Sequence, residues 1–172
     1  MMPGMEREPV VVRAAELGDA PPLNDIYNHY VRTSHVTFDL EPMSLDRRRR
    51  WLEERSGGSH RVLVAHDGRR VLGFAASGPH LPRPGYATSV DTSVYLDPSY
   101  TGRGIGASLY AGLFEALRGE DLHRALAGVA LPNPASVALH RRSGFSQVAL
   151  FTEQGRKFGR FWDVAWFERP LP

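Results

Sequence analysis

A glycine-rich turn between a predicted strand and a predicted helix constrains this chain more than any other stretch. Polar and apolar side chains alternate over residues 91–96, and their β-branched and aromatic content predicts a strand. Pro98 ends that strand because proline has no amide to donate to a ladder. Apolar side chains then recur at helical spacing from Ile105 to Leu117, which predicts a helix. The intervening turn carries few side chains because it contains Gly102, Gly104 and Gly106.

The start of this helix has the properties of a phosphate-binding site. Its first amides have no partner within the helix and lie at the positive end of the helix dipole. Arg103 adds a cation, although an ordinary glycine-rich turn is the alternative interpretation. The P-loop is excluded because Gly-Lys-Ser/Thr is missing. Gly102, Gly104 and Ala107 fit the dinucleotide-binding spacing, but residues 97–101 separate them from the strand, which argues against a Rossmann fold.

The composition excludes several classes of protein. A chain of 172 residues predicts a single domain, which we expect at residues 9–172 after a flexible tail at residues 1–8. No stretch approaches a membrane span, and a net charge of +2 is too small to indicate a nucleic-acid partner. The absence of cysteine excludes disulfides and a thiol nucleophile and is compatible with the cytoplasm. The histidines show no metal-ligand spacing, so we expect no metal.

The remaining pattern predicts a mixed α/β sheet flanked by helices. Asp67-Gly68 indicates a hairpin, and Gly144 fits the left-handed position after a helix. We expect strands at residues 10–13, 61–65, 71–76, 125–130, 147–151 and 161–167, helices after Asp19, after Ser44 to about Arg55, and at residues 134–142, and loops at residues 31–42 and 155–159.

Several motifs together resemble the GNAT superfamily (GCN5-related N-acetyltransferases). They are TGRGIG at residues 101–106, Asn133, and LHRRSGF at residues 139–145. The stretches at residues 27–42, 93–98, 134–145 and 155–164 resemble the phosphinothricin acetyltransferase branch of that superfamily. The resemblance covers nearly the whole chain and is more specific for the fold and reaction than for the acceptor. It implies the GNAT fold, with a mostly antiparallel sheet whose central parallel strands separate.

The resemblance also implies that acetyl-CoA is the co-substrate and lies between those two strands. The backbone of the first strand would bind the pantetheine, and the turn would hold the pyrophosphate. Asn133 would bind the pantetheine arm, cap the next helix, or do both. The implied cofactor-binding residues are Val94, Tyr95, Leu96, Gly102, Arg103, Gly104, Ile105, Gly106, Ala107 and Asn133.

Direct acetyl transfer requires a base for the amine proton and a polarised carbonyl. Asp91 matches the family's glutamate base and is one methylene shorter, which favours a bridging water; a hydrogen-bonding role is the alternative. His140 matches the position where much of the superfamily has a tyrosine acid and where this branch has a histidine. It would protonate the leaving thiolate or relay the amine proton, since imidazole titrates near neutrality. A histidine on the helix surface is the alternative interpretation.

The resemblance suggests phosphinothricin, methionine sulfoximine or methionine sulfone as the acceptor, and a role in antibiotic or herbicide resistance. Candidate substrate-binding residues are Phe38, Arg83, Tyr86, Asp91 and Lys157. Packing under its loop is the alternative for Phe38. Thr101 stands where the family has Gln or Arg, so Arg103 is expected to compensate. Ala87 stands where related enzymes carry an arginine, so Arg83, His80 or Lys157 is expected to supply that charge.

Two other functions stay open at this point. One is acetylation of a protein N-terminus, a lysine or a polyamine by the same fold. The other is a non-catalytic module that senses acyl-CoA. The resemblance further implies a homodimer, to which the aromatic residues near the C-terminus contribute unless they belong to the core: Phe158, Phe161, Trp162, Trp166 and Phe167.

Overall fold

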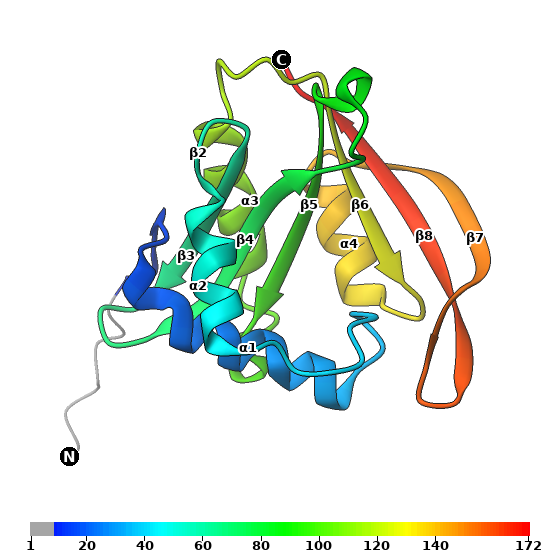
Figure 1. The fold of residues 1–172 in the computed structure, drawn as a ribbon, viewed down its shortest axis with the longest axis horizontal. Helices are drawn as coiled ribbons and strands as arrows, with labels where there is room; N and C mark the ends of the chain where they lie inside the picture. The colour runs from blue at the N-terminus through cyan, green and yellow to red at the C-terminus, as the bar shows by residue number, and fades with distance from the viewer. Residues whose placement is uncertain (1–8) are drawn as a thin grey trace.

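The computed structural model describes residues 9–172, so the expected tail at residues 1–8 lies outside the described residues. Four α-helices and a sheet of eight strands make up this part of the chain (Figure 1). The helices are α1 (Ala20–Thr33), α2 (Leu45–Glu53), α3 (Ile105–Ala116) and α4 (Pro134–Arg142). The strands are β1 (Val11–Ala14), β2 (Ser56–Gly57), β3 (His60–His66), β4 (Val71–Pro79), β5 (Ser89–Leu96), β6 (Arg124–Ala130), β7 (Ser146–Lys157) and β8 (Arg160–Pro170). Short 3₁₀ turns lie at η1 (Leu17–Asp19), η2 (Pro84–Tyr86) and η3 (Pro98–Tyr100).

The sheet has the order β1-β3-β4-β5-β6-β8-β7, with the short β2 paired to β3. All neighbouring strands are antiparallel except β5 and β6, which are parallel. The expected mixed α/β fold is therefore confirmed. No helix of the described residues is long and apolar enough to cross a bilayer.

Helices cover both faces of this sheet (Figure 1). One apolar cluster packs α3 and residues of α4 against the sheet, centred on Leu109 and Leu113. The other packs α1 and α2 against β3 and β4, centred on Leu23 and Phe74. Each helix buries one apolar stripe in this way, so the core consists of two layers on either side of the strands.

The parallel pair at the centre of the sheet is short. Ser89, Val90 and Asp91 of β5 pair with Arg124, Ala125 and Leu126 of β6, and no later residues of the two strands pair. Beyond this point the strands separate, and Figure 1 shows β5 and β6 diverging toward the lower edge of the molecule. The sheet therefore contains a V-shaped opening whose vertex lies at Asp91.

Local sequence signals explain most of the element boundaries. Gly68 and Gly144 adopt φ of +83° and +85°, as the hairpin and helix end require. The amide of Phe145 donates to the carbonyl of His140 at 3.0 Å, which completes a Schellman motif at the end of α4. The Ser44 hydroxyl accepts from the Arg47 amide at 3.3 Å and caps α2.

Some predicted boundaries were wrong. The helix α1 continues to Thr33, into the expected loop at residues 31–42, and α2 ends at Glu53 rather than near Arg55. The expected loop at residues 155–159 is instead a long hairpin, with β7 running to Lys157. Phe158 and Gly159 form its turn with φ of +53° and +74°, a geometry that matches the twist of paired strands.

Candidate active site

The V-shaped opening exposes main-chain groups of β5. The amide of Asp97 donates to Leu72 of β4 at 2.8 Å. Main-chain groups alternate between the two edges of a strand, so the peptide groups of Val94 and Leu96 face β6 and the opening. The Tyr30 hydroxyl of α1 donates to the Leu96 carbonyl at 2.6 Å. The main chain of Tyr95 belongs instead to the ladder with β4, and its ring packs against α1, so only two of the three expected pantetheine contacts face the cleft.

The glycine turn before α3 is open to solvent. Gly102 and Gly104 have φ of +74° and +80°, and a Cβ added at either one would meet nothing within 4 Å. The first bond of the helix runs from the Ser108 amide to the Gly104 carbonyl at 3.2 Å. The amides of Ile105, Gly106 and Ala107 therefore have no partner within the helix, as an anion site requires.

Other residues of the turn have structural contacts. A Cβ at Gly106 would lie 3.0 Å from the Leu139 side chain, so this glycine allows α4 to approach α3 closely. Arg103 folds back, with its guanidinium 4.8 Å from the Tyr100 ring and donating to the Ser99 carbonyl at 3.1 Å. Its positive charge stays beside the turn.

Asp91 forms a hydrogen bond with His80 that its sequence context did not predict. His80 Nδ1 donates to Asp91 Oδ1 at 2.6 Å. Burial raises the pKa of Asp91, and the hydrogen bond from His80 partly opposes that effect. The edges of Tyr86 and Trp166 flank the imidazole, with ring centroids 6.0 and 6.2 Å away. The vertex of the opening therefore carries a carboxylate and an imidazole beneath aromatic rings.

A pocket of about 430 Å³ adjoins this pair, and His80, Arg83, Tyr86 and Ala87 are among its lining residues. Arg83 and Tyr86 are both exposed at its rim. Arg83 is thus the cation in this pocket, since Ala87 has no charge to supply. Two of the expected substrate-binding residues, Arg83 and Tyr86, line the pocket, and a third, Asp91, is hydrogen-bonded to His80 in its wall.

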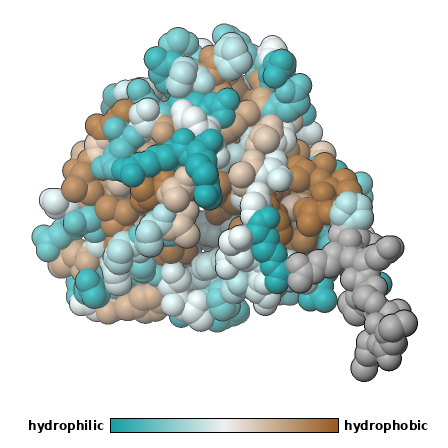
Figure 2. Space-filling view, turned by 180° about the vertical axis from the view of Figure 1, so that it is seen from behind, coloured by the Kyte–Doolittle hydropathy of each residue, from teal (hydrophilic) through white to brown (hydrophobic). Residues whose placement is uncertain are grey.

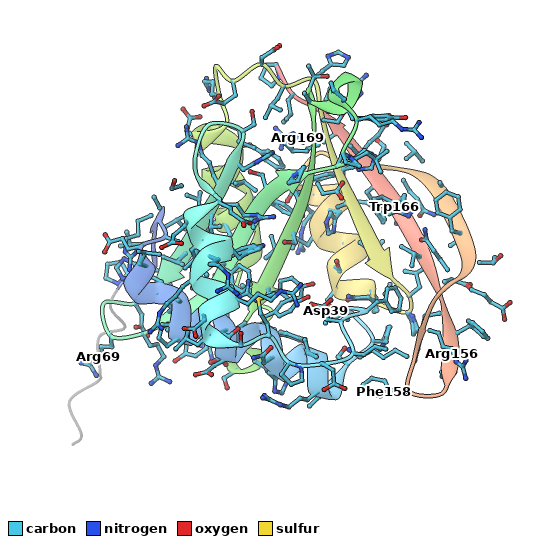
Figure 3. The ribbon with its side chains drawn as sticks, in the orientation of Figure 1. Asp39, Arg69, Arg156, Phe158, Trp166 and Arg169 are labelled. Carbon is cyan, nitrogen blue, oxygen red and sulfur yellow. The ribbon has the colours of Figure 1, made fainter. Side chains whose placement is uncertain are left out.

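The other two candidate substrate residues lie where loop 34–43 meets the β7–β8 hairpin. The Phe38 ring occupies the space that a Cβ at Gly155 would fill, which agrees with the packing interpretation. Lys157 is buried, and its Nζ donates to the Thr37 carbonyl at 2.8 Å. Figure 3 shows Asp39, from the same loop, near the open end of the cleft. These contacts hold the loop in front of the opening.

His140 lies on the opposite face of the sheet from Asp91. It is buried on α4, and its Nδ1 donates to the Ser136 carbonyl at 2.8 Å, so Nε2 accepts from the Tyr110 hydroxyl at 2.8 Å. Burial lowers the pKa of His140. The Tyr110 hydroxyl also lies 3.4 Å from Thr92 Oγ1, which donates to the Leu126 carbonyl at the vertex. A chain of polar groups therefore connects His140 to the cleft, and the helix-surface interpretation was wrong.

Asn133 caps α4, because its side-chain oxygen accepts from the Ser136 amide at 3.1 Å. This contact agrees with the capping interpretation, and its role toward pantetheine stays a prediction.

The sequence reasoning missed two partners in this site. His80 was considered only as a charge for the substrate, although pairing of β4 with β5 places Gly78 opposite Asp91 and His80 just beyond. Trp166 was grouped with an interface, but its indole lies against Gly128 of β6, about 3.3 Å from a Cβ added there, and its ring centroid is 6.2 Å from that of His80.

The comparisons with known proteins identify the class of protein that this fold and cleft define. The model of the GNAT acetyltransferase family matches residues 23–145. The chain belongs to this family, and the expected enzymatic class is confirmed.

Three proteins are similar to this chain over most of its length. A phosphinothricin N-acetyltransferase of Streptomyces coelicolor is 53% identical over 99% of this chain and 100% of that protein. An L-methionine sulfoximine/L-methionine sulfone acetyltransferase of Pseudomonas aeruginosa is 34% identical over 93% of this chain and 94% of its own length. The solved phosphinothricin acetyltransferase of Sinorhizobium meliloti, in complex with acetyl-CoA, has a TM-score of 0.89 at 30% identity, with 94% and 88% of the two chains covered. This agreement confirms acetyl-CoA as the expected co-substrate.

Proposed function

We propose that this enzyme transfers an acetyl group from acetyl-CoA to the primary amine of a small amino-acid-like acceptor, with phosphinothricin, methionine sulfoximine and methionine sulfone as the leading candidates. The observation that carries the proposal is the vertex of the V, where a carboxylate lies at the end of the shared parallel pairing of β5 and β6. The names of the relatives support the acceptor class.

Different residues of the cleft and the adjoining pocket are placed to bind different parts of acetyl-CoA and of the acceptor. The main chain of Val94 and Leu96 is placed to bind the pantetheine amides, and the free amides before α3 are placed to bind the pyrophosphate. Arg83 at the rim of the pocket supplies a cation for the acceptor's carboxylate or phosphinate. Such a pocket favours an anionic amino acid over a polyamine.

Groups on opposite faces of the sheet have different roles in this proposal. Asp91, alone or through a water, accepts a proton from the amine. His140 is neutral at pH 7 because burial lowers its pKa, so its Nε2 accepts from the Tyr110 hydroxyl and orients it on the other face of the vertex, while the leaving sulfur takes its proton from the attacking nitrogen. Acetyl-CoA supplies the activated acyl group, and the chain supplies position and proton transfer.

The test is acetyl-CoA turnover with a panel of phosphinothricin, methionine sulfoximine, methionine sulfone, spermidine and a lysine peptide. We expect turnover of the first three, and a loss of about 100-fold or more in kcat for Asp91→Ala. Asp46→Ala removes an exposed carboxylate of α2 and is the matched control. Preference for spermidine or the peptide would contradict the acceptor class, and acetyl-CoA binding without turnover of any amine would indicate a sensor.

The proposal extends to assembly and biological role. We infer a homodimer, because β7 is an edge strand that exposes Val148, Leu150 and Phe151. Figure 2 shows apolar surface on the side of the molecule where the β7–β8 hairpin lies. Consumption of acetyl-CoA favours a cytoplasmic location, and acetylation of phosphinothricin would give resistance to that compound.

A further inference from the structure

The pairing of His80 with Asp91 leaves the imidazole oriented for proton transfer. Nδ1 carries the proton that is donated to the carboxylate, so Nε2 of the neutral ring has a free lone pair. No hydrogen bond joins Nε2 to any residue from 9 to 172. This is the tautomer that a carboxylate holds in place when a histidine acts as a general base.

The His80 ring lies at the wall of the acceptor pocket, and only 19% of its side chain is exposed to solvent. Tyr86 and Trp166 contact it edge-on from two elements and restrict its rotation. An imidazole attached to Asp91 also extends the reach of a carboxylate that is shorter than glutamate.

We propose that His80, rather than Asp91, takes the proton of the acceptor amine, and that Asp91 is its positioning residue. This inference rests on the proposed acetyl transfer and revises one step of it: His80 accepts the amine proton in place of Asp91 acting alone or through a water. Ionisable groups near the pair include Arg83 and Tyr86 on the η2 loop and His60 of β3 across the pocket. The Arg55 guanidinium also lies near, 3.1 Å from a Cβ added at Gly78, the residue paired with Asp91.

The proton balance of the step is simple. The acceptor arrives as an ammonium ion and loses one proton to Nε2. The lone pair then forms the N–C bond while the C–S bond of the thioester breaks, and the second nitrogen proton ends on sulfur to give the CoA thiol. The imidazolium, stabilised by Asp91, releases its proton to water. The products are the acetylated amine, the thiol and one proton.

The experiment measures kcat and KM for wild type, His80→Ala, His80→Gln and Asp91→Asn, with and without added imidazole. We expect kcat of both His80 variants to fall about 100-fold or more while KM for acetyl-CoA stays unchanged. Imidazole should restore a substantial part of kcat to His80→Ala and none to Asp91→Asn. His123→Ala removes an exposed histidine and is the matched control.

Three outcomes decide the matter. Unchanged kcat in both His80 variants would overturn the assignment and leave Asp91 as the base. A loss that imidazole does not restore in His80→Ala would assign a structural role to the ring and overturn it equally. A wild-type protein that acetylates no amine would refute the proposed function itself, whereas an active wild type with active His80 variants refutes only this inference.

Discussion

Adjacent residues of one strand supply chemistry to both sides of the cleft. Side chains of β5 alternate between the two faces of the sheet, so Asp91 meets His80 on the α1 and α2 face while Thr92 meets Tyr110 and His140 on the other. Both histidines are held by a polar partner at hydrogen-bond distance. The vertex therefore has a hydrogen-bonded polar group on each face of the sheet.

The buried position of Asp91 predicts that this functional carboxylate lowers the stability of the folded protein at neutral pH. Burial raises its pKa in the folded protein above the unfolded value, so the stability it contributes is fully present at low pH and is lost as the pH rises through the folded pKa. At pH 7 the ionised carboxylate disfavours folding. We expect Asp91→Asn to raise Tm at pH 7, with the difference vanishing at about pH 3, below the unfolded pKa of aspartate, as thermal unfolding at both pH values would measure. A lower Tm at pH 7 would mean that the hydrogen bond with His80 outweighs the cost of burial.

Single residues were predictable where a motif fixed their position. Asp91 and His140 were found from their spacing to Ser-Val-Tyr and to Gly-Phe. His80 was not, because its partnership depends on strand register and on a loop whose path composition does not determine. The four consecutive arginines at residues 47–50 indicate a solvent-exposed helix surface. Arg48 is nevertheless buried, with its guanidinium 4.6 Å from the centroid of the Trp51 ring. Tertiary contacts decide such cases.

At the scale of elements, the turn before α3 is the part that a ligand would contact most closely. Its two left-handed glycines leave open space where side chains would otherwise stand. The strand before this turn and the helix after it were predictable, because the hydrophobic periodicity on each side and the glycines between them indicate the same boundaries. The lengths of α1 and of β7 were not, because helix packing and strand pairing extended them beyond their local signals.

A pair of glycine substitutions separates backbone strain from ligand binding. Gly104→Ala and Gly119→Ala both place a Cβ at φ near +80°, in positions with nothing within 4 Å. We expect both to cost about 1–3 kcal/mol in unfolding free energy. Only Gly104→Ala should also raise KM for acetyl-CoA, by about tenfold, because its methyl group enters the predicted pyrophosphate site. Equal KM values for the two variants would place the cofactor elsewhere.

At the scale of the molecule, the two edges of the sheet differ. The β7 edge is long and carries exposed Leu150 and Phe151, whereas the opposite edge is the four-residue β1. An unpaired apolar edge favours association with another strand.

Light scattering after gel filtration tests whether the chain associates through its β7 edge rather than its β1 edge. We expect the wild type to have about twice the chain mass of 19.1 kDa. A lysine at the β7 edge, Leu150→Lys, should shift the protein toward the monomer because charge on an edge strand opposes pairing. Val11→Lys, at an apolar position on β1 of similar exposure, should leave the mass unchanged. A monomeric wild type would rule out the inferred homodimer.

The central sheet is also divided into two halves that share only three residue pairs. A molecule bound between β5 and β6 contacts both halves and so resists their separation. A ligand that binds only the native state lowers the ratio of unfolded to folded protein, and the effect grows with the ratio of the free ligand concentration to Kd. The cellular concentration of CoA and its thioesters would therefore influence how long this enzyme resists heat and proteases.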